Sequence, residues 1–201
     1  MTAPRPYHHG DLRTALLRQA ERTLAEHGAD GLSLRELARE VGVSHAAPRR
    51  HFPDKRALLD ALAEVGYERL GRRLDTALND AEGAFAERLV LFARVYVEFA
   101  VEHRELLLLM HGSKEGSRGD RLREANDRAF AAPVRLLAEA RARGDIDPDT
   151  SGRADMTVLA LLQGLAVLAA TGMAAGANGT KPLGELVSGA VETLLAGLRP
   201  R

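Results

Sequence analysis

The chain has 201 residues, of which 45% are hydrophobic and 28% are charged, so it can bury a core and is not compositionally disordered. It contains no cysteine, which excludes disulfides, cysteine-ligated metal sites and a thiol nucleophile. Basic and acidic side chains balance at 28 each, so net charge alone does not indicate an acidic partner.

The hydrophobic pattern predicts neither a targeting segment nor a membrane span. The first nine residues hold no apolar run behind their basic residue, so we expect no secretory signal and a cytoplasmic protein. The uncharged stretch from Met156 to Thr180 is long enough to span a bilayer, but glycines and polar residues dilute it and basic or aromatic flanks are missing. We therefore expect no membrane partner. The stretch instead predicts a helix buried on nearly all sides, where Gly164 and the alanines allow close backbone approach across an interface.

Apolar residues recur at spacings of three and four throughout, which predicts an all-α chain. The first helix is expected over residues 11–27, with Asp11 as its N-cap and Gly28 after its end. Its apolar face comprises Leu12, Leu16, Ala20 and Leu24.

A second, short helix has a well-marked beginning and end. Ser33 and Glu36 match the capping box, in which the two side chains bond reciprocally to backbone N–H groups. Gly42 can adopt the left-handed conformation that ends a helix. Because the next helix begins almost at once, the two must cross steeply, with the small Ala38 where their backbones approach.

The third helix is expected from Ser44 to about Phe52. Pro48 stands near the limit of what a first turn tolerates, and Pro53 makes continuation unfavourable. Six basic residues against three acidic ones lie between Arg35 and Arg56, a mild positive bias.

The rest of the chain predicts further helices separated by turns. Asp54 should cap a long helix that follows it, and residues 112–120 are expected to form a polar loop. The expected helices cover residues 55–79, 84–102, 105–111, 121–143, 151–173 and 183–198.

A short capped helix, a glycine turn and a second short helix form the helix-turn-helix arrangement, whose second helix fits the major groove of B-DNA. The N-terminal residues of such a helix reach base edges first, and alanine can contact a thymine methyl group. Basic and hydroxyl side chains around it serve mainly phosphates. The predicted DNA-binding residues are Ser33, Ser44, His45, Ala46, Ala47, Arg49, Arg50, His51 and Lys55.

Two segments make the sequence resemble the TetR-type bacterial transcriptional regulators. They are Leu32-Ser-Leu-Arg-Glu-Leu-Ala-Arg-Glu-Val-Gly-Val-Ser44 and Arg50-His-Phe-Pro-Asp-Lys-Arg-Ala-Leu-Leu59. The resemblance implies an N-terminal three-helix DNA-binding domain, residues 1–52, and a C-terminal helical bundle for ligand binding and dimerisation, residues 53–201. It also implies a homodimeric regulator, most often a repressor, on a double-stranded and palindromic DNA operator.

One position departs from the family it resembles. The family usually places an aromatic residue, most often tyrosine, at the position of Arg49, where it braces the helix and touches a phosphate. An arginine makes the phosphate contact better than a phenol does, but it cannot brace by packing in the same way. The alternative interpretation is a helical-bundle small-molecule-binding protein that has lost operator binding because of Arg49 and Pro48.

An aromatic stripe suggests where a small molecule would bind. One helical face carries apolar residues at spacings of four and three: Phe85, Leu89, Phe92, Tyr96 and Phe99. Such a face fits either the bundle core or the wall of a largely apolar cavity. Tyr96 and His111 would be the polar groups of that cavity. The predicted ligand-binding residues are Phe92, Tyr96, Phe99, Met110, His111 and Phe130.

Catalytic signatures are missing from the sequence. There is no phosphate-binding glycine loop after a strand, no His-Glu-x-x-His and no serine elbow. We expect no enzymatic activity, no cofactor and no metal site.

Overall fold

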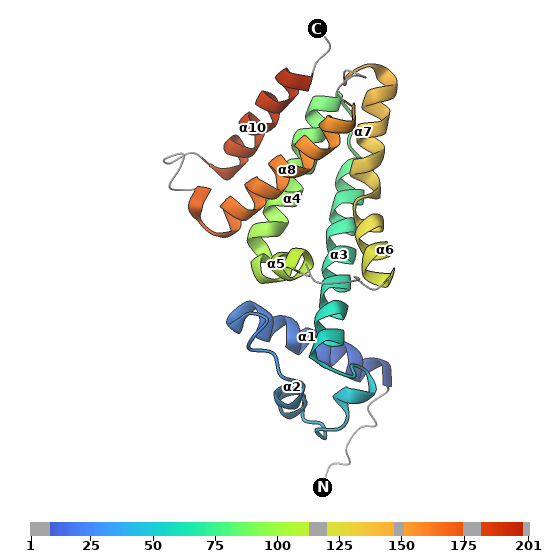
Figure 1. Ribbon diagram of the computed structural model, residues 1–201, viewed down its shortest axis with the longest axis vertical. Helices are drawn as coiled ribbons and strands as arrows, with labels where there is room; N and C mark the ends of the chain where they lie inside the picture. Colours follow the sequence, from blue (N-terminus) through green and yellow to red (C-terminus); the bar gives the residue numbers. More distant parts are fainter. Residues whose placement is uncertain (1–8, 113–119, 147–150, 175–181, 199–201) are drawn as a thin grey trace. The chain divides into compact units, whose positions relative to one another are not determined.

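The computed structural model describes residues 9–112, 120–146, 151–174 and 182–198 (Figure 1). These residues form helices and turns without a strand, which confirms the all-α class. The chain divides into two compact units. We call Met1–Gly66 with Glu105–Leu122 the head unit, and Tyr67–Arg104 with Arg123–Arg201 the bundle unit.

The head unit is built from short helices around a leucine-rich core. Its elements are α1 (His9–His27), α2 (Leu34–Val41), the 3₁₀-helix η1 (Pro48–Arg50), the first part of α3 (Lys55–Asn79) and α5 (Arg104–Gly112). Leu16, Ala20 and Leu24 are buried as predicted. Because α1 begins at His9, Asp11 lies inside its first turn, and the predicted N-cap at Asp11 is wrong.

Helix α2 ends as predicted but begins differently. Gly42 is left-handed, with φ 78°, and the N–H of Val43 donates to the carbonyl of Ala38 at 2.9 Å. Ser33 has the extended backbone of an N-cap, yet its hydroxyl makes no capping hydrogen bond. The predicted capping box is therefore not formed, and Glu36 instead lies 4.0 Å from Arg39, one turn along the helix.

The predicted α-helix over residues 44–52 is wrong in its geometry. The segment contains turns and a 3₁₀-helix of three residues, Pro48–Arg50. The cause is Pro48, which has no N–H to donate to the carbonyl of Ser44 in the α-helical pattern. That carbonyl accepts from Ala47 at 3.0 Å instead, one residue earlier, which tightens the turn.

Helix α3 follows after Asp54 and has the predicted bounds, Lys55–Asn79. The Asp54 carboxylate accepts a hydrogen bond from the N–H of Ala57 at 2.8 Å, so the predicted cap is confirmed. Gly66 and Tyr67, adjacent residues of α3, belong to different units. A single continuous helix thus supplies residues to both.

The bundle unit is centred on α4 (Phe85–Glu102), which packs against the helices α7, α8 and α10 (Figure 1). Their bounds are Ala131–Arg143 for α7, Ser151–Ala170 for α8 and Leu183–Leu198 for α10. The polar loop predicted before α6 (Asp120–Ala129) lies mostly outside the described residues.

The single helix predicted over residues 121–143 is two helices, with the break at Phe130. Pro133 is the reason, because its ring would clash with the carbonyl of Ala129 and it has no N–H to donate to that carbonyl. Proline is tolerated here in the first turn of α7. Phe130, at the break, leaves the regular helical backbone with φ −99° and ψ 9°.

Helix α8 buries only part of its apolar surface in this chain. Its window Arg153–Ala170 is long and apolar enough to cross a membrane by length and composition alone, and 28% of that window is buried. Val158 and Leu162 point into the unit, whereas Met156 is 66% exposed and Leu159 is exposed as well. Within the single chain, one face of α8 packs against α4 and α10, so burial on its other sides by an interface across Gly164 stays a prediction.

Candidate functional site

Residues 44–52, which we call the reading segment, present polar and small side chains to solvent. Ser44, His45 and Ala46 are exposed, and Arg49 and Arg50 are exposed one turn later. Ala47 and His51 are half-buried. The predicted base-contacting residues thus lie on a surface that a DNA groove can approach.

The opposite side of the reading segment is fixed to the core of the head unit. Phe52 is 2% exposed, and the guanidinium carbon of Arg13, on α1, lies 5.4 Å from the centre of its ring. Pro48 is buried a few residues before it in the sequence. Pro48 and Phe52 thus anchor the reading segment to the core, while Arg49 remains exposed.

A shallow hollow of about 480 Å³ gathers several of the predicted phosphate-binding residues. Ser33, Arg49 and Lys55 line it together with Arg35 and Asp54. The hollow includes the N-terminal turn of α2, where backbone N–H groups and the helix dipole favour an anion. Since Ser33 does not cap this helix with its side chain, its hydroxyl does not compete for those N–H groups.

Two residues of this hollow refine the sequence-based prediction. Arg35 is exposed and lines the hollow but was not among the predicted DNA-binding residues. The signal for it was its place in the basic stretch, one residue after the start of α2. The ammonium of Lys55 donates to the backbone carbonyl of Asp30 at 3.1 Å, which holds it beside the turn between α1 and α2.

Four of the six predicted ligand-binding residues lie together in the bundle unit. The ring centres of Phe92 and Tyr96 are 6.3 Å apart, and those of Tyr96 and Phe130 are 6.0 Å apart. Phe99 is buried one turn further along α4. We call these four residues the aromatic cluster. Tyr96 is 1% exposed, and burial raises the pKa of its hydroxyl above the usual range, so the group stays neutral.

The other two predicted ligand-binding residues, Met110 and His111, belong to the head unit. Met110 is buried, and its sulfur would lie 2.7 Å from a Cβ added at Gly66, so α5 packs closely on α3 there. His111 is half-buried on the last turn of α5. Within the described residues, no three side chains of the metal-binding types gather into a site.

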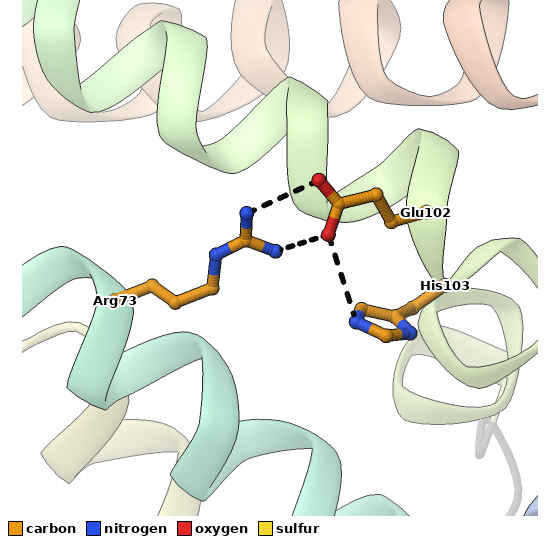
Figure 2. Close-up of polar contacts among 3 residues, drawn as sticks. All are labelled: Arg73, Glu102 and His103. Atoms are coloured by element: carbon orange, nitrogen blue, oxygen red, sulfur yellow. Dashed lines mark hydrogen bonds and ion pairs between the residues drawn. The ribbon is translucent and has the colours of Figure 1, made fainter.

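An ion pair joins α3 to the end of α4 within the bundle unit (Figure 2). Arg73 donates to both carboxylate oxygens of Glu102, and Nε2 of His103 lies 3.9 Å from one of them. The imidazole of His103 also lies against Phe99 in a tilted arrangement, with 4.8 Å between the ring centres and 55° between the ring planes. The hydrogen bond from Arg73 lowers the pKa of Glu102 and raises that of Arg73 itself.

The fold and the reading segment define a helix-turn-helix protein of the DNA-binding regulator class. A sequence profile described as "Bacterial regulatory proteins, tetR family" matches residues 16–62, and one described as "Tetracyclin repressor-like, C-terminal domain" matches residues 89–194. The chain belongs to the tetR family, whose members are DNA-binding transcription regulators.

Relatives of known sequence or structure agree with this assignment. The nucleoid occlusion factor SlmA of Aliivibrio fischeri (strain MJ11) is 30% identical over 131 residues, which are 65% of each chain. That of Vibrio vulnificus (strain YJ016) is 34% identical over 103 residues, 51% of this chain and 52% of that one. The chain thus spans between about half and two thirds of the length of these curated relatives.

Solved structures match over nearly the whole chain. A protein of unknown function from Rhodococcus sp. RHA1 is 46% identical, with a TM-score of 0.86 over 98% of this chain and 100% of that one. The TetR family transcriptional regulator PfmR from Thermus thermophilus is 22% identical, with a TM-score of 0.66 over 92% of this chain and 99% of that one. The second likeness shows the fold alone.

Proposed function

We propose that this protein is a cytoplasmic, homodimeric repressor that a small, largely apolar molecule releases from a palindromic operator. The observation that carries the proposal is the hollow beside the reading segment. It places Arg35, Arg49 and Lys55 around the N-terminus of α2, with Asp54 as the one acidic side chain. Three cations against one carboxylate give the lining a net positive charge, which favours a phosphate.

The exposed first residues of the reading segment are proposed to contact the bases. His45, Ala46 and Ala47 approach base edges, while Ser44, Arg50 and His51 contact the backbone on either side. Arg49 takes the phosphate contact that a tyrosine makes elsewhere in the family, and as a guanidinium it can donate two hydrogen bonds to one phosphate.

A homodimer follows from the apolar surface that α8 leaves open. Met156, Leu159, Val167 and Leu168 are all large, apolar and exposed on that helix. In contrast, Val187 and Val191 of α10 are buried inside the chain, so they contribute to the unit's own core. An apolar face of this kind is typical of a stable, isologous interface between two copies.

The small molecule is proposed to bind at the aromatic cluster of the bundle unit. Phe92, Phe99 and Phe130 supply apolar surface, and the neutral hydroxyl of Tyr96 supplies a directed polar group. Ligand pockets in proteins combine these two features. The predicted contributions of Met110 and His111, which belong to the head unit, remain predictions.

Coupling between ligand and operator is proposed to act through α3, which supplies residues to both units. Two reading segments must be held about 34 to 36 Å apart to engage successive major grooves. A ligand that favours one packing of the bundle unit would change the direction of α3 and with it that spacing. Such coupling requires a difference in ligand affinity between the two packings.

A gel-shift titration at several salt concentrations tests DNA binding, with random DNA and with the DNA upstream of the protein's own gene. Arg49→Ala should lower the slope of log affinity against log salt by about one, since one phosphate contact is lost. Arg72→Ala, which removes an exposed arginine of α3 in the bundle unit, is the matched control and should leave the slope unchanged. If the unaltered protein binds neither DNA at low salt, the protein is a helical-bundle binding protein instead of a repressor.

A reciprocal titration tests the coupling. The affinity for one identified ligand is measured with and without saturating operator, and the operator should weaken it by the same factor by which the ligand weakens DNA binding. Factors of about 5 to 150 are usual for such coupling. Equal ligand affinities in the two titrations would refute the mechanism even if both sites were real.

A further inference from the structure

The head unit contains a second hollow, of about 650 Å³, that shares no lining residue with the reading segment or the aromatic cluster. It is formed by the first turns of α3, by α5 and by the turn that follows α1. Most of its wall is apolar. The apolar lining residues are Ala29, Leu59, Ala63, Leu108, Leu109 and Leu122.

The volume of the hollow falls within the range of small-molecule sites, and its lining is mostly apolar. Pockets that enclose small organic ligands usually measure about 300 to 1,000 Å³ and are lined mainly by hydrophobic side chains. Leu108 is 40% exposed on α5, although its neighbours Leu106 and Leu107 are buried. Its side chain therefore contributes little to the core of the unit and would gain burial from an apolar occupant.

Besides Gly112, the lining also contains three charged side chains, Arg56, Asp60 and Glu105. Arg56 is exposed, whereas both carboxylates are half-buried. One oxygen of Glu105 would lie 3.8 Å from a Cβ added at Gly28, so this carboxylate is held beside the turn that ends α1. With two carboxylates and one guanidinium, the lining carries a formal charge of −1.

We infer that this hollow binds a small hydrophobic cation, such as an organic ammonium or phosphonium ion. The apolar wall covers the body of the molecule, and Asp60 and Glu105 balance its charge at the rim. A hydrophobic anion of the same shape would meet a lining whose net charge is −1 even with Arg56 included, which disfavours it. This site lies in the same unit as the reading segment, and it goes beyond the proposed ligand site at the aromatic cluster.

The test uses two ions of matched shape and opposite charge, tetraphenylphosphonium and tetraphenylborate. Isothermal titration calorimetry of the full chain, without DNA, should show one tetraphenylphosphonium ion per chain and weaker binding of tetraphenylborate. Because no DNA is present, failure here is independent of failure of the repressor function. Stronger binding of the anion, or no binding of the cation, would overturn the proposal.

Variants locate the site. Asp60→Asn and Glu105→Gln keep the shape of the lining and should each weaken the cation about two- to fivefold, as expected for partly exposed charge pairs. Leu108→Lys places a positive charge in the apolar wall and should weaken binding of the cation about tenfold or more. Val134→Lys introduces the same charge at another exposed apolar position, on α7, and should have no effect.

Two outcomes would contradict the assignment of the site. Equal affinities in Leu108→Lys and Val134→Lys would place the bound cation elsewhere, for example at the aromatic cluster. Unchanged affinity in the double variant Asp60→Asn with Glu105→Gln would show that the carboxylates do not select the charge. The affinity of the double amide variant tests the proposal even if Leu108→Lys unfolds the head unit, because the amides preserve side-chain shape.

Discussion

Arg73 and Glu102 form a two-pronged ion pair, with the guanidinium nitrogens 2.6 and 3.2 Å from the two carboxylate oxygens. The pair joins the C-terminal third of α3 to the last residue of α4 (Figure 2). The guanidinium carbon also lies 6.0 Å from the ring centre of Phe99 in the aromatic cluster. Any change in the packing of α3 against α4 must therefore strain or break this pair.

The first prediction concerns the pH dependence of that pair. The pKa of Glu102 lies below its ordinary value of 4.5, mainly because Arg73 donates to it. A lowered folded-state pKa stabilises the fold above the unfolded-state pKa and ceases to do so as the pH falls through the folded value. Glu102→Gln should therefore lower the free energy of unfolding at pH 7 by less than about 1 kcal/mol, since the carboxylate is about half exposed.

Urea unfolding at fixed protein concentration checks this, with the unaltered chain and the variant compared at several pH values. Their difference should shrink as the pH falls below the ordinary pKa of a glutamate. Glu124→Gln, in a more exposed ion pair with Arg128 at 3.6 Å, is the control and should show a smaller difference at every pH. A difference for Glu102→Gln that persists at low pH would mean that the pair does not act through its charge.

The second prediction separates two glycines of α3. A Cβ at Gly71 would lie 2.9 Å from the backbone Cα of Ala129. A Cβ at Gly66 would meet side chains instead, Sδ of Met110 at 2.7 Å and Cγ of Leu106 at 3.1 Å. Alanine in a helix interior gains about 1 kcal/mol over glycine, and overpacking against backbone costs about 1 to 3 kcal/mol. Gly71→Ala should therefore destabilise the protein, while Gly66→Ala should change the free energy of unfolding by less than about 1 kcal/mol.

Chemical unfolding of the two variants, followed by circular dichroism, gives both values. The two substitutions remove the same conformational freedom from the unfolded chain. The difference between their free energies of unfolding therefore reports the close approach of α3 and α6. Equal stabilities for Gly71→Ala and Gly66→Ala would show that α6 can withdraw at little cost.

The third prediction tests the homodimer at α8. In the single chain, a Cβ at Gly164 meets nothing within 4 Å, and the residue is exposed. Gly164→Phe should therefore leave the fold intact but prevent a second copy from packing on α8. Sedimentation at micromolar concentration should show a dimer for the unaltered protein and a monomer for the variant, with unchanged helicity. Ala138→Phe, at an exposed position on α7, should remain a dimer.

The fourth prediction concerns the role of Lys55. Lys55→Ala should weaken all DNA sequences about equally and lower the salt slope by about one, because it removes one phosphate-neutralising charge. Lys55→Arg, which keeps the charge, should retain the slope. Gel shifts with single-base operator variants provide the check. A loss of affinity confined to one base position would assign Lys55 to base reading.

The sequence by itself determined the fold class, the helix-turn-helix and most helix bounds. These depend on local signals that a single chain segment carries: apolar residues at helical spacing, the Asp54 cap before α3 and the left-handed Gly42 after α2. Each acts through neighbours within one turn, so no tertiary information is needed to interpret it.

Other features depended on which of two alternative local structures is more stable, and the sequence alone does not decide that. Ser33 and Glu36 match a capping box, yet the hydroxyl does not bond and Glu36 lies beside Arg39 instead. Pro48 and Pro133 were both visible, but whether a proline is accommodated, tightens a turn or divides a helix depends on the packing around it. The tightened turn at Pro48 and the break at Phe130 therefore appear in the structure alone.

The candidate sites divide in the same way. Residue type and spacing were enough to propose Lys55 as a phosphate contact and to place Tyr96 among aromatic residues. The phosphate contact of Arg49 came from the resemblance to the TetR-type regulators. Only the tertiary structure shows that Arg35 lines the same hollow as Arg49, and that Met110 belongs to a different unit from the aromatic cluster. The physical reason is that a hollow is made by side chains far apart in the sequence, and their approach is set by how helices pack and by nothing within any one helix.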